Sequence, residues 1–315
     1  MNRTYLRLVT YNVNGLPGTL DLSTLPWVLR PLAWVYKLIK GSYLISLGHT
    51  EEENEARARK IGYYIYEDYA DIVALQEDFN YHEEISRLTG FYRRGKHLGG
   101  FDLSKIFSTT ECWSYFPFPR FKADGISFFA KSQGITIDSE HIVRWDKSYG
   151  YISHANDLLT HKGFRLYELT VNNAFKLDVY IVHMDADFYD KETCPDVQGD
   201  IIARRTQLTQ LTNYIIARKA KGIWHPIVIM GDTNCYPKNK WDVENIRNYL
   251  TIPFTRDRYT TIFEAMPEVM RDVDRMFIIN DTRTKAQITV SDCGYDTEVH
   301  LSDHMPFTAT LRIEY

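Results

Sequence analysis

The chain has 315 residues, of which 44% are hydrophobic and 25% are charged, and its formal net charge is −4. This composition is typical of a soluble globular protein with a large core, and either one sizeable domain or two small ones would fit. The negative net charge excludes a global positive field that would gather nucleic acid, although a local basic groove remains compatible with it.

Strand and helix patterns are distributed along the whole chain. Runs of β-branched and aromatic residues predict strands at 7–13, 71–77, 125–131, 164–171, 177–184, 226–232, 275–280 and 305–313. Several runs are apolar almost throughout, which indicates central strands covered on both faces by other layers. Helical periodicity predicts helices over 52–70 and 200–220, each directly before a buried strand. We therefore expect one α/β sandwich domain over residues 1–315.

The most apolar stretch lies between residues 20 and 47, in a predicted insertion at about 18–48. Prolines and basic residues interrupt every window long enough to cross a bilayer, so a transmembrane helix is not expected. The N-terminus shows no signal-peptide pattern, which favours a cytoplasmic or a mature secreted chain. The four cysteines form no C-x-x-C pair, so neither a zinc site nor a disulfide framework is predicted.

Polar residues recur at the ends of the predicted strands. They are Asn12, Glu77, Asp124, His183, Asp232, Asn234, Asp274, Asp303 and His304. Because strand ends in layered α/β folds open into a shared crevice, these side chains can converge although they span almost the whole chain. Each also has a simpler interpretation. An Asn or Asp can start a turn, as can the Asp303–His304 pair, Glu77 can cap the next helix, and His183 can be a packed core histidine.

Six short motifs that contain most of these residues follow one another in a distinctive order. They are YNVNGLP (11–17), LQEDFN (75–80), VHMDAD (182–187), GDTN (231–234), VDRMFI (273–278) and SDH (302–304). Together they resemble the endonuclease/exonuclease/phosphatase superfamily, which includes deoxyribonuclease I, apurinic endonucleases, inositol polyphosphate phosphatases and neutral sphingomyelinases. The resemblance implies a four-layer α/β sandwich and a divalent-metal-dependent phosphodiesterase.

The resemblance also implies which residues hold the metal and which act as base. Hydrolysis of a phosphate ester needs an activated water, a cation for the non-bridging oxygens, and an acid or metal at the leaving oxygen. Glu77 is expected to bind Mg²⁺ or Mn²⁺, with Asn12 as a neutral oxygen donor and Asp303 beside the metal. His304 resembles the family's general base, and Asp274 is expected to hold its imidazole in the correct tautomer.

The remaining residues are expected to contact the water and the substrate. Asp232 would bind the attacking water or its proton, and Asn234 could donate its amide to the phosphate. His183 would contact the phosphate or the leaving group, with Asp124 as its candidate partner. Two histidines with separate carboxylate partners can hold different protonation states at one pH, as acid and base catalysis requires.

Three sequence details favour the branch of bacterial neutral sphingomyelinases. They are the N-x-x-G-L-P motif, the segment KADGISFFAKS (122–132), which resembles a D-G-G strand, and HKGFRLYELTV (161–171), which resembles a K-G-F segment. The expected substrate is a phosphodiester, with a lipid headgroup favoured and cleavage of the phospholipase C type. The alternatives are a Mg²⁺-dependent nuclease, an inositol-phosphate phosphatase, or a non-catalytic module that binds a lipid surface or a partner.

Residues 20–47 contain Trp27, Trp34 and two tyrosines among aliphatic residues, with only three basic charges. Such a segment can pack as part of the core. It can equally form a peripheral membrane contact, because aromatic rings favour the headgroup region and Lys and Arg side chains can extend toward water.

Overall fold

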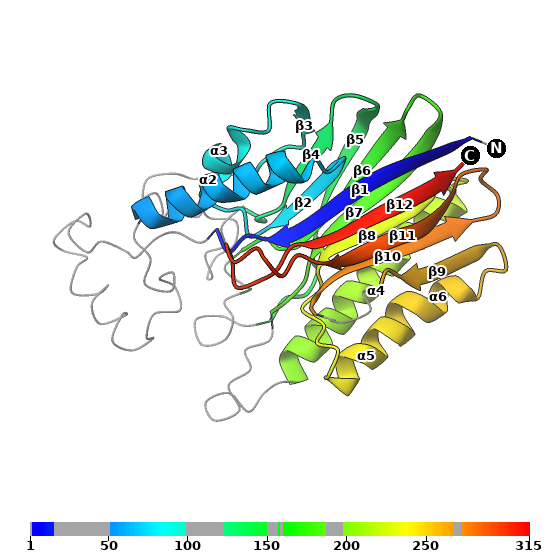
Figure 1. Cartoon of the computed structure of the whole chain (residues 1–315). Helices are drawn as coiled ribbons and strands as arrows, with labels where there is room; N and C mark the ends of the chain where they lie inside the picture. Colours follow the sequence, from blue (N-terminus) through cyan, green and yellow to red (C-terminus); the bar gives the residue numbers. More distant parts are fainter. Residues whose placement is uncertain are drawn as a thin grey trace.

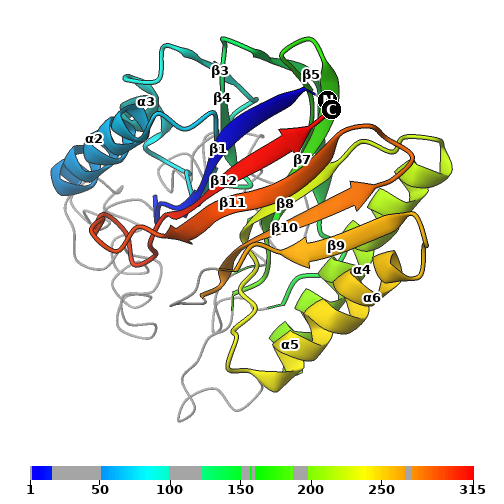
Figure 2. The ribbon, with the colours of Figure 1, turned by 45° about the vertical axis from the view of Figure 1, so that its right-hand side comes forward.

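The computed structural model describes residues 2–15, 51–98, 123–149, 157, 160–186, 198–266 and 272–315. Within these ranges the chain forms two six-stranded sheets that pack against each other, with helices on their outer faces (Figure 1, Figure 2). The predicted insertion at about 18–48, with Trp27 and Trp34, lies outside the described residues. None of the described helices is both long and apolar enough to cross a membrane.

The first sheet has the strand order β11-β12-β1-β2-β4-β3. Its strands are β1 (Arg3–Asn12), β2 (Ile72–Gln76), β3 (Tyr92–Arg94), β4 (Ser127–Lys131), β11 (Gln287–Tyr295) and β12 (Phe307–Glu314). Strands β1 and β2 are parallel, whereas the other neighbours are antiparallel. The first and last strands of the chain, β1 and β12, therefore lie side by side in this sheet.

The second sheet has the strand order β5-β6-β7-β8-β10-β9. Its strands are β5 (Ile135–Arg144), β6 (Gly163–Val171), β7 (Phe175–His183), β8 (Ile227–Asp232), β9 (Thr260–Glu264) and β10 (Asp274–Asp281). Strands β7 and β8 are parallel, and β10 returns antiparallel to β8. Every residue of β8 and β10 is buried, in agreement with the apolar runs that predicted central strands.

Helices cover the outer face of each sheet, which makes four layers. The helices are α2 (Glu51–Asp68), α3 (His82–Ser86), α4 (Gln198–Ala220), α5 (Lys240–Ile246), the π-helical segment η3 (Arg247–Thr251) and α6 (Ile252–Thr255). Ala58, Ile61 and Ile65 of α2 pack on the first sheet. Leu208 and Leu211 of α4 pack on the second sheet. A third apolar cluster, formed by the facing sides of both sheets, fills the centre. The predicted four-layer sandwich is confirmed.

All eight predicted strands and both predicted helices are present, but four strands had no sequence prediction. The missed strands are β3, β5, β9 and β11, and they are the four edge strands of the two sheets. Most residues of β5 and β11 are only partly buried. Because an edge strand is covered less completely, it needs no continuous apolar run, and the pattern that identifies central strands is missing.

Candidate active site

The ends of the central strands bring the predicted site residues together. In the second sheet, His183 at the end of β7 pairs in register with Asp232 at the end of β8, and Asp232 pairs in turn with Asp274 at the start of β10. In the first sheet, Asn12 ends β1, and Glu77 directly follows β2. Residues from five strands in two packed sheets therefore meet at one edge of the sandwich.

Asn12 connects the two sheets by holding a carboxylate from each. Its Nδ2 donates to Oε1 of Glu77 at 3.1 Å and to Oδ2 of Asp232 at 2.9 Å. Its Oδ1 accepts the backbone N–H of Asn14 at 3.1 Å, which fixes the orientation of the amide. The amide oxygen that we expected to face a metal is therefore turned away from the two carboxylates. Asn12 thus bridges Glu77 and Asp232 in this structure, and its predicted role as a metal ligand remains a prediction.

The backbone around Glu77 is held in an unusual conformation. Glu77 has a φ of 57°, in the left-handed region that non-glycine residues rarely adopt. Its carbonyl accepts the N–H of Gly15 at 2.8 Å and of Phe79 at 2.9 Å. A side chain at position 15 would collide with this carbonyl oxygen, so the close approach of the two backbones requires glycine there. Such strain persists only where surrounding contacts enforce it, and it is common at functional sites.

His304 and Asp274 form the closest pair in the site. Nδ1 of His304 lies 2.6 Å from Oδ2 of Asp274, and its Nε2 lies 3.9 Å from Oδ2 of Asp232. Burial lowers the pKa of His304, but the charge of Asp274 and the hydrogen bond to it outweigh this effect and raise the pKa well above its usual value. Burial raises the pKa of Asp274, although the charge of His304 opposes this shift. This geometry is the His-orienting-Asp pair that the sequence predicted.

His183 is fully buried, and neither of its ring nitrogens has a hydrogen-bond partner among the described residues. Its Nε2 lies 3.7 Å from Oε1 of Glu77 and 4.0 Å from Oδ2 of Asp232. Burial, followed by the charges of Lys162 and His304, holds the pKa of His183 well below its usual value. The imidazole is therefore neutral at neutral pH, and the two histidines differ in protonation as expected. The cause for His183 is burial, however, and not a carboxylate partner.

The donor set at this edge fits a hard divalent cation. Glu77, Asp232 and Asp274 place three carboxylates together, and burial raises the pKa of both Glu77 and Asp274. A raised carboxyl pKa means that nearby positive charge is insufficient, and oxygen-rich sites of this kind suit Mg²⁺ or Mn²⁺. Oδ1 of Asp274 is also buried without a hydrogen-bond partner among the described residues. Asp232, Asp274 and His304 each place one ligand atom within 4.8 Å of the others.

Asn234 and Asp303 lie at the margin of this cluster. Asn234 donates one amide hydrogen to the carbonyl of Met184 at 3.0 Å, and its other amide hydrogen has no bond among the described residues. Asp303 is exposed and accepts a hydrogen bond from Ser302 at 3.1 Å. Its charge raises the pKa of Glu77, although less than burial does. Their predicted contacts, with the phosphate for Asn234 and beside the metal for Asp303, remain predictions.

The predicted pairing of Asp124 with His183 is wrong. Both carboxylate oxygens of Asp124 accept hydrogen bonds from Arg165, at 2.7 Å from Nε and 2.6 Å from Nη2. Arg165 is fully buried and also approaches Glu140 at 3.1 Å. Because a guanidinium with no carboxylate would be costly at this depth, Asp124 neutralises Arg165 and is not available to orient His183.

Replacing Asp124 with Asn is expected to destabilise the fold by about 3–5 kcal/mol, because it leaves the buried Arg165 without its closest counter-charge. Urea unfolding of the two proteins measures this difference. As a control, Asp138→Asn removes an exposed pair with Lys176 and should cost less than about 1 kcal/mol. An Asp124→Asn protein that is as stable as the wild type but inactive would show that Asp124 has a catalytic role.

Two residues of the site region were missed by the sequence analysis. Lys162 is buried, forms an ion pair with Asp157, and lowers the pKa of both Glu77 and His183, in each case as the second cause after burial. Trp145 donates from Nε1 to the His183 carbonyl at 2.7 Å and so fixes the end of β7. The K-G-F resemblance drew attention to the segment with Lys162, but a lysine ahead of an apolar strand gives no sign that it is buried.

Comparison with known proteins shows similarity of fold to solved structures. No family model matches the chain, and no curated protein matches it. A humanized D. rerio TDP2 structure has a TM-score of 0.58 at 14% identity, with 98% of each chain covered. Sphingomyelinase C from Streptomyces griseocarneus has a TM-score of 0.57 at 15% identity, covering 98% of this chain and 99% of that one. A Staphylococcus aureus beta toxin mutant with bound magnesium ions has a TM-score of 0.56 at 18% identity, covering 97% and 99%.

Proposed function

We propose that this chain is a divalent-metal-dependent phosphodiesterase and that its substrate is a phospholipid headgroup, cleaved as by a sphingomyelinase-like phospholipase C. The observation that carries the proposal is the meeting of Glu77, Asp232, the His304–Asp274 pair and His183 at one edge of the two sheets. A single turn or a packed core histidine would explain any one of these residues. Neither explains a buried histidine with two unbonded nitrogens beside the carboxylates of Glu77 and Asp232.

The residues divide into a metal-binding part and a proton-transfer part. Glu77 and Asp232, held together by Asn12, would hold the cation, which when bound neutralises phosphate oxygens and makes water more acidic. His304, oriented by Asp274, would take the proton of the attacking water. Neutral His183 would donate a hydrogen bond to a phosphate oxygen or to the leaving group. This donation would satisfy one of its two unbonded nitrogens.

Support for the lipid substrate is separate from support for the chemistry. It comes from the sequence details around 122–132 and 161–171 and from the similarity in fold to sphingomyelinase C. The fold similarity to a D. rerio TDP2 structure complexed with a single-strand DNA product keeps a nuclease as the second candidate. The magnesium ions bound to the beta toxin structure support Mg²⁺ as the metal to test first.

A substrate panel separates these possibilities. The purified chain is assayed on sphingomyelin, phosphatidylcholine, plasmid DNA and inositol polyphosphates, each with Mg²⁺, Mn²⁺ or excess chelator. We expect release of a phosphorylated headgroup from sphingomyelin, and we expect chelator to abolish it. Cleavage of DNA alone would replace the lipid proposal with a nuclease. Full turnover in excess chelator would show that the reaction needs no metal ion. No turnover on any substrate would favour a binding module.

A further inference from the structure

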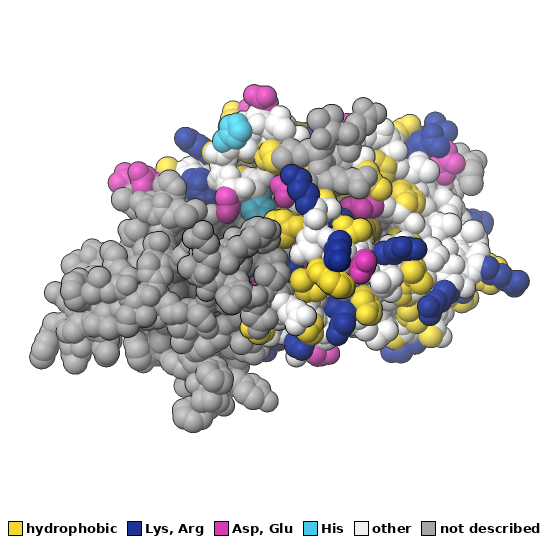
Figure 3. All heavy atoms as spheres, turned by 90° about the horizontal axis from the view of Figure 1, so that it is seen from below, with side chains coloured by type: hydrophobic (Ala, Val, Ile, Leu, Met, Phe, Trp, Pro, Cys, Tyr) yellow, Lys and Arg dark blue, Asp and Glu magenta, His cyan; other side chains and the backbone are white. Residues whose placement is uncertain are grey.

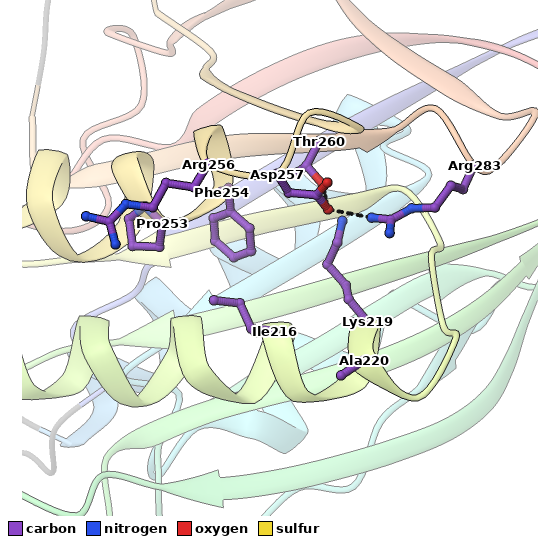
Figure 4. A pocket seen from close by; sticks show the side chains of 9 residues that line it. All are labelled: Ile216, Lys219, Ala220, Pro253, Phe254, Arg256, Asp257, Thr260 and Arg283. Carbon is purple, nitrogen blue, oxygen red and sulfur yellow. Dashed lines mark hydrogen bonds and ion pairs between the residues drawn. The ribbon is translucent and has the colours of Figure 1, made fainter.

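A cavity of about 420 Å³ lies between α4 and α6, away from the candidate active site. It is bordered by Arg283, which follows the far end of β10, whereas Asp274 at the near end belongs to the site. Eight strand residues therefore separate the two places by about 25 Å. Figure 4 shows the rings of Pro253 and Phe254 along the cavity, with Arg256 at one end and Lys219 and Arg283 at the other. The cavity thus has an apolar floor, and its cations at one end are already paired, Lys219 with Asp281 and Arg283 with Asp257 and Asp281.

The helical layer around this cavity carries an excess of positive charge. Residues 198–260 contain ten basic and five acidic residues, although the whole chain has a net charge of −4. Three of the five acids are buried, as is Arg204, and Arg218 and Lys219 pair with acids outside this range, so seven basic residues face Glu244 and Asp257 at the surface. Arg205, Arg247 and Arg256 are exposed, and none of them has an ion pair in the part of the chain that the structure describes. A positive surface on a negatively charged protein gives the molecule a preferred orientation toward anions.

Exposed apolar side chains lie among these arginines. Ile216 of α4 is 41% exposed, and Trp241 and Val243 of α5 are 52% and 45% exposed. We call the outer surface of α4, α5, η3 and α6 the basic helical face. Seen from below Figure 1, the molecule shows Lys and Arg side chains interspersed with apolar ones over this layer (Figure 3). Clusters in which apolar and basic side chains alternate are typical of surfaces that meet a lipid interface.

We propose that the basic helical face binds the surface of an anionic phospholipid bilayer through the exposed Arg205, Arg247 and Arg256. Arginine and lysine attract anionic headgroups, and aliphatic groups such as Ile216 and Val243 gain by leaving water at the acyl boundary. A nucleic acid would use the same cations and could stack a base on Trp241, but it would gain little from exposed aliphatic side chains such as Ile216 and Val243. This surface goes beyond the proposed activity and does not depend on it.

Vesicle co-sedimentation in the presence of chelator tests the proposal without any turnover. The full chain is mixed with vesicles of phosphatidylcholine alone or of phosphatidylcholine with phosphatidylglycerol. We expect binding only to the mixed vesicles, and we expect it to weaken as salt is added. The double variant Arg247→Glu, Arg256→Glu should bind about tenfold more weakly or worse, because both attractive charges become repulsive. Ile216→Ser should weaken binding without changing its salt dependence.

The matched control places the same charge change on the opposite helical layer. Arg59 and Lys60 are exposed on α2, so the variant Arg59→Glu, Lys60→Glu alters the net charge equally and should bind as the wild type does. Circular dichroism confirms that each variant is folded. Equal losses in both variants, or no binding of the wild type to anionic vesicles, would overturn the proposal. Tight binding of duplex DNA that is lost only in the Arg247, Arg256 variant would assign the face to nucleic acid instead. Displacement of the protein from vesicles by glycerol phosphate would show that the basic helical face binds soluble anions and not a bilayer surface.

Discussion

Replacing Glu77 with Gln is expected to lower turnover by at least about a hundredfold, because it removes a charged metal ligand while keeping the shape of the side chain. The amide oxygen of the new side chain can still accept from Asn12, so the bridge to Asp232 is retained. We therefore expect lost metal binding rather than lost folding. Titration of Mn²⁺ by calorimetry, together with turnover measured over a range of Mg²⁺ concentrations, separates the two.

Stability in chelator provides a second measurement for the same variant. Burial raises the pKa of Glu77, so the metal-free folded state holds this proton more tightly than the unfolded chain does. The resulting stability is present below the unfolded pKa and is lost as the pH rises through the folded pKa. At neutral pH without metal, Glu77→Gln should therefore be at least as stable as the wild type. With metal, only the wild type should gain stability.

The partly buried residue Glu84 offers a control on the neighbouring helix α3, where it pairs with Arg87. Glu84→Gln should leave both turnover and the gain in stability from metal unchanged. A Glu77→Gln protein that keeps full turnover at low Mg²⁺ would show that Glu77 is not a metal ligand. In that case the cluster of Asp232, Asp274 and His304 would be the remaining candidate for the metal.

Replacing His304 with Ala is expected to reduce turnover by about a hundredfold or more, which is the usual contribution of a positioned general base. The reaction requires the neutral imidazole. Because Asp274 raises the pKa of His304, turnover should increase with pH until His304 has lost its proton. Asp274→Asn removes this charge, so the rise in activity should move to lower pH. The maximal rate should fall at the same time, because the tautomer is no longer fixed.

The pH profile distinguishes this role from a structural one. Loss of packing alone would scale the whole profile down without moving it, whereas loss of the Asp274 charge must shift its acidic limb. His183→Ala should also lower turnover by about a hundredfold, and the double variant with His304→Ala should lose less than the product of the two effects. An Asp274→Asn profile that keeps the wild-type midpoint would argue against His304 as the base.

The central strands of both sheets could be predicted from the sequence, whereas the edge strands and the short helices could not. Central strands such as β8 and β10 are buried on both faces, so they are apolar throughout and stand out in the sequence. An edge strand such as β11 has a partner on one side only and alternates weakly. Helix α5 is short, and most of its residues are exposed, so its periodicity is also weak.

The candidate site followed the same rule. Glu77, His183 and Asp232 stand directly at the ends of apolar runs, so strand prediction also predicted their convergence. The partner of Asp124 was mistaken because Arg165 lies 41 positions away, in β6 of the other sheet, and nothing in the sequence tells which cation reaches a buried carboxylate. The orientation of the Asn12 amide depends on one backbone N–H, which is a feature of the folded chain alone.

The register of three neighbouring strands has a consequence for how such a protein can diverge. His183, Asp232 and Asp274 lie in one row across β7, β8 and β10, and inserting a single residue within any of these strands would turn its side chain to the opposite face. The positions of the catalytic side chains thus depend on the same strand pairing that forms the core. Insertions that preserve this strand pairing can accumulate only in the loops beyond the strand ends, next to the three site residues. A lineage can therefore exchange the substrate it recognises while inheriting the reaction unchanged.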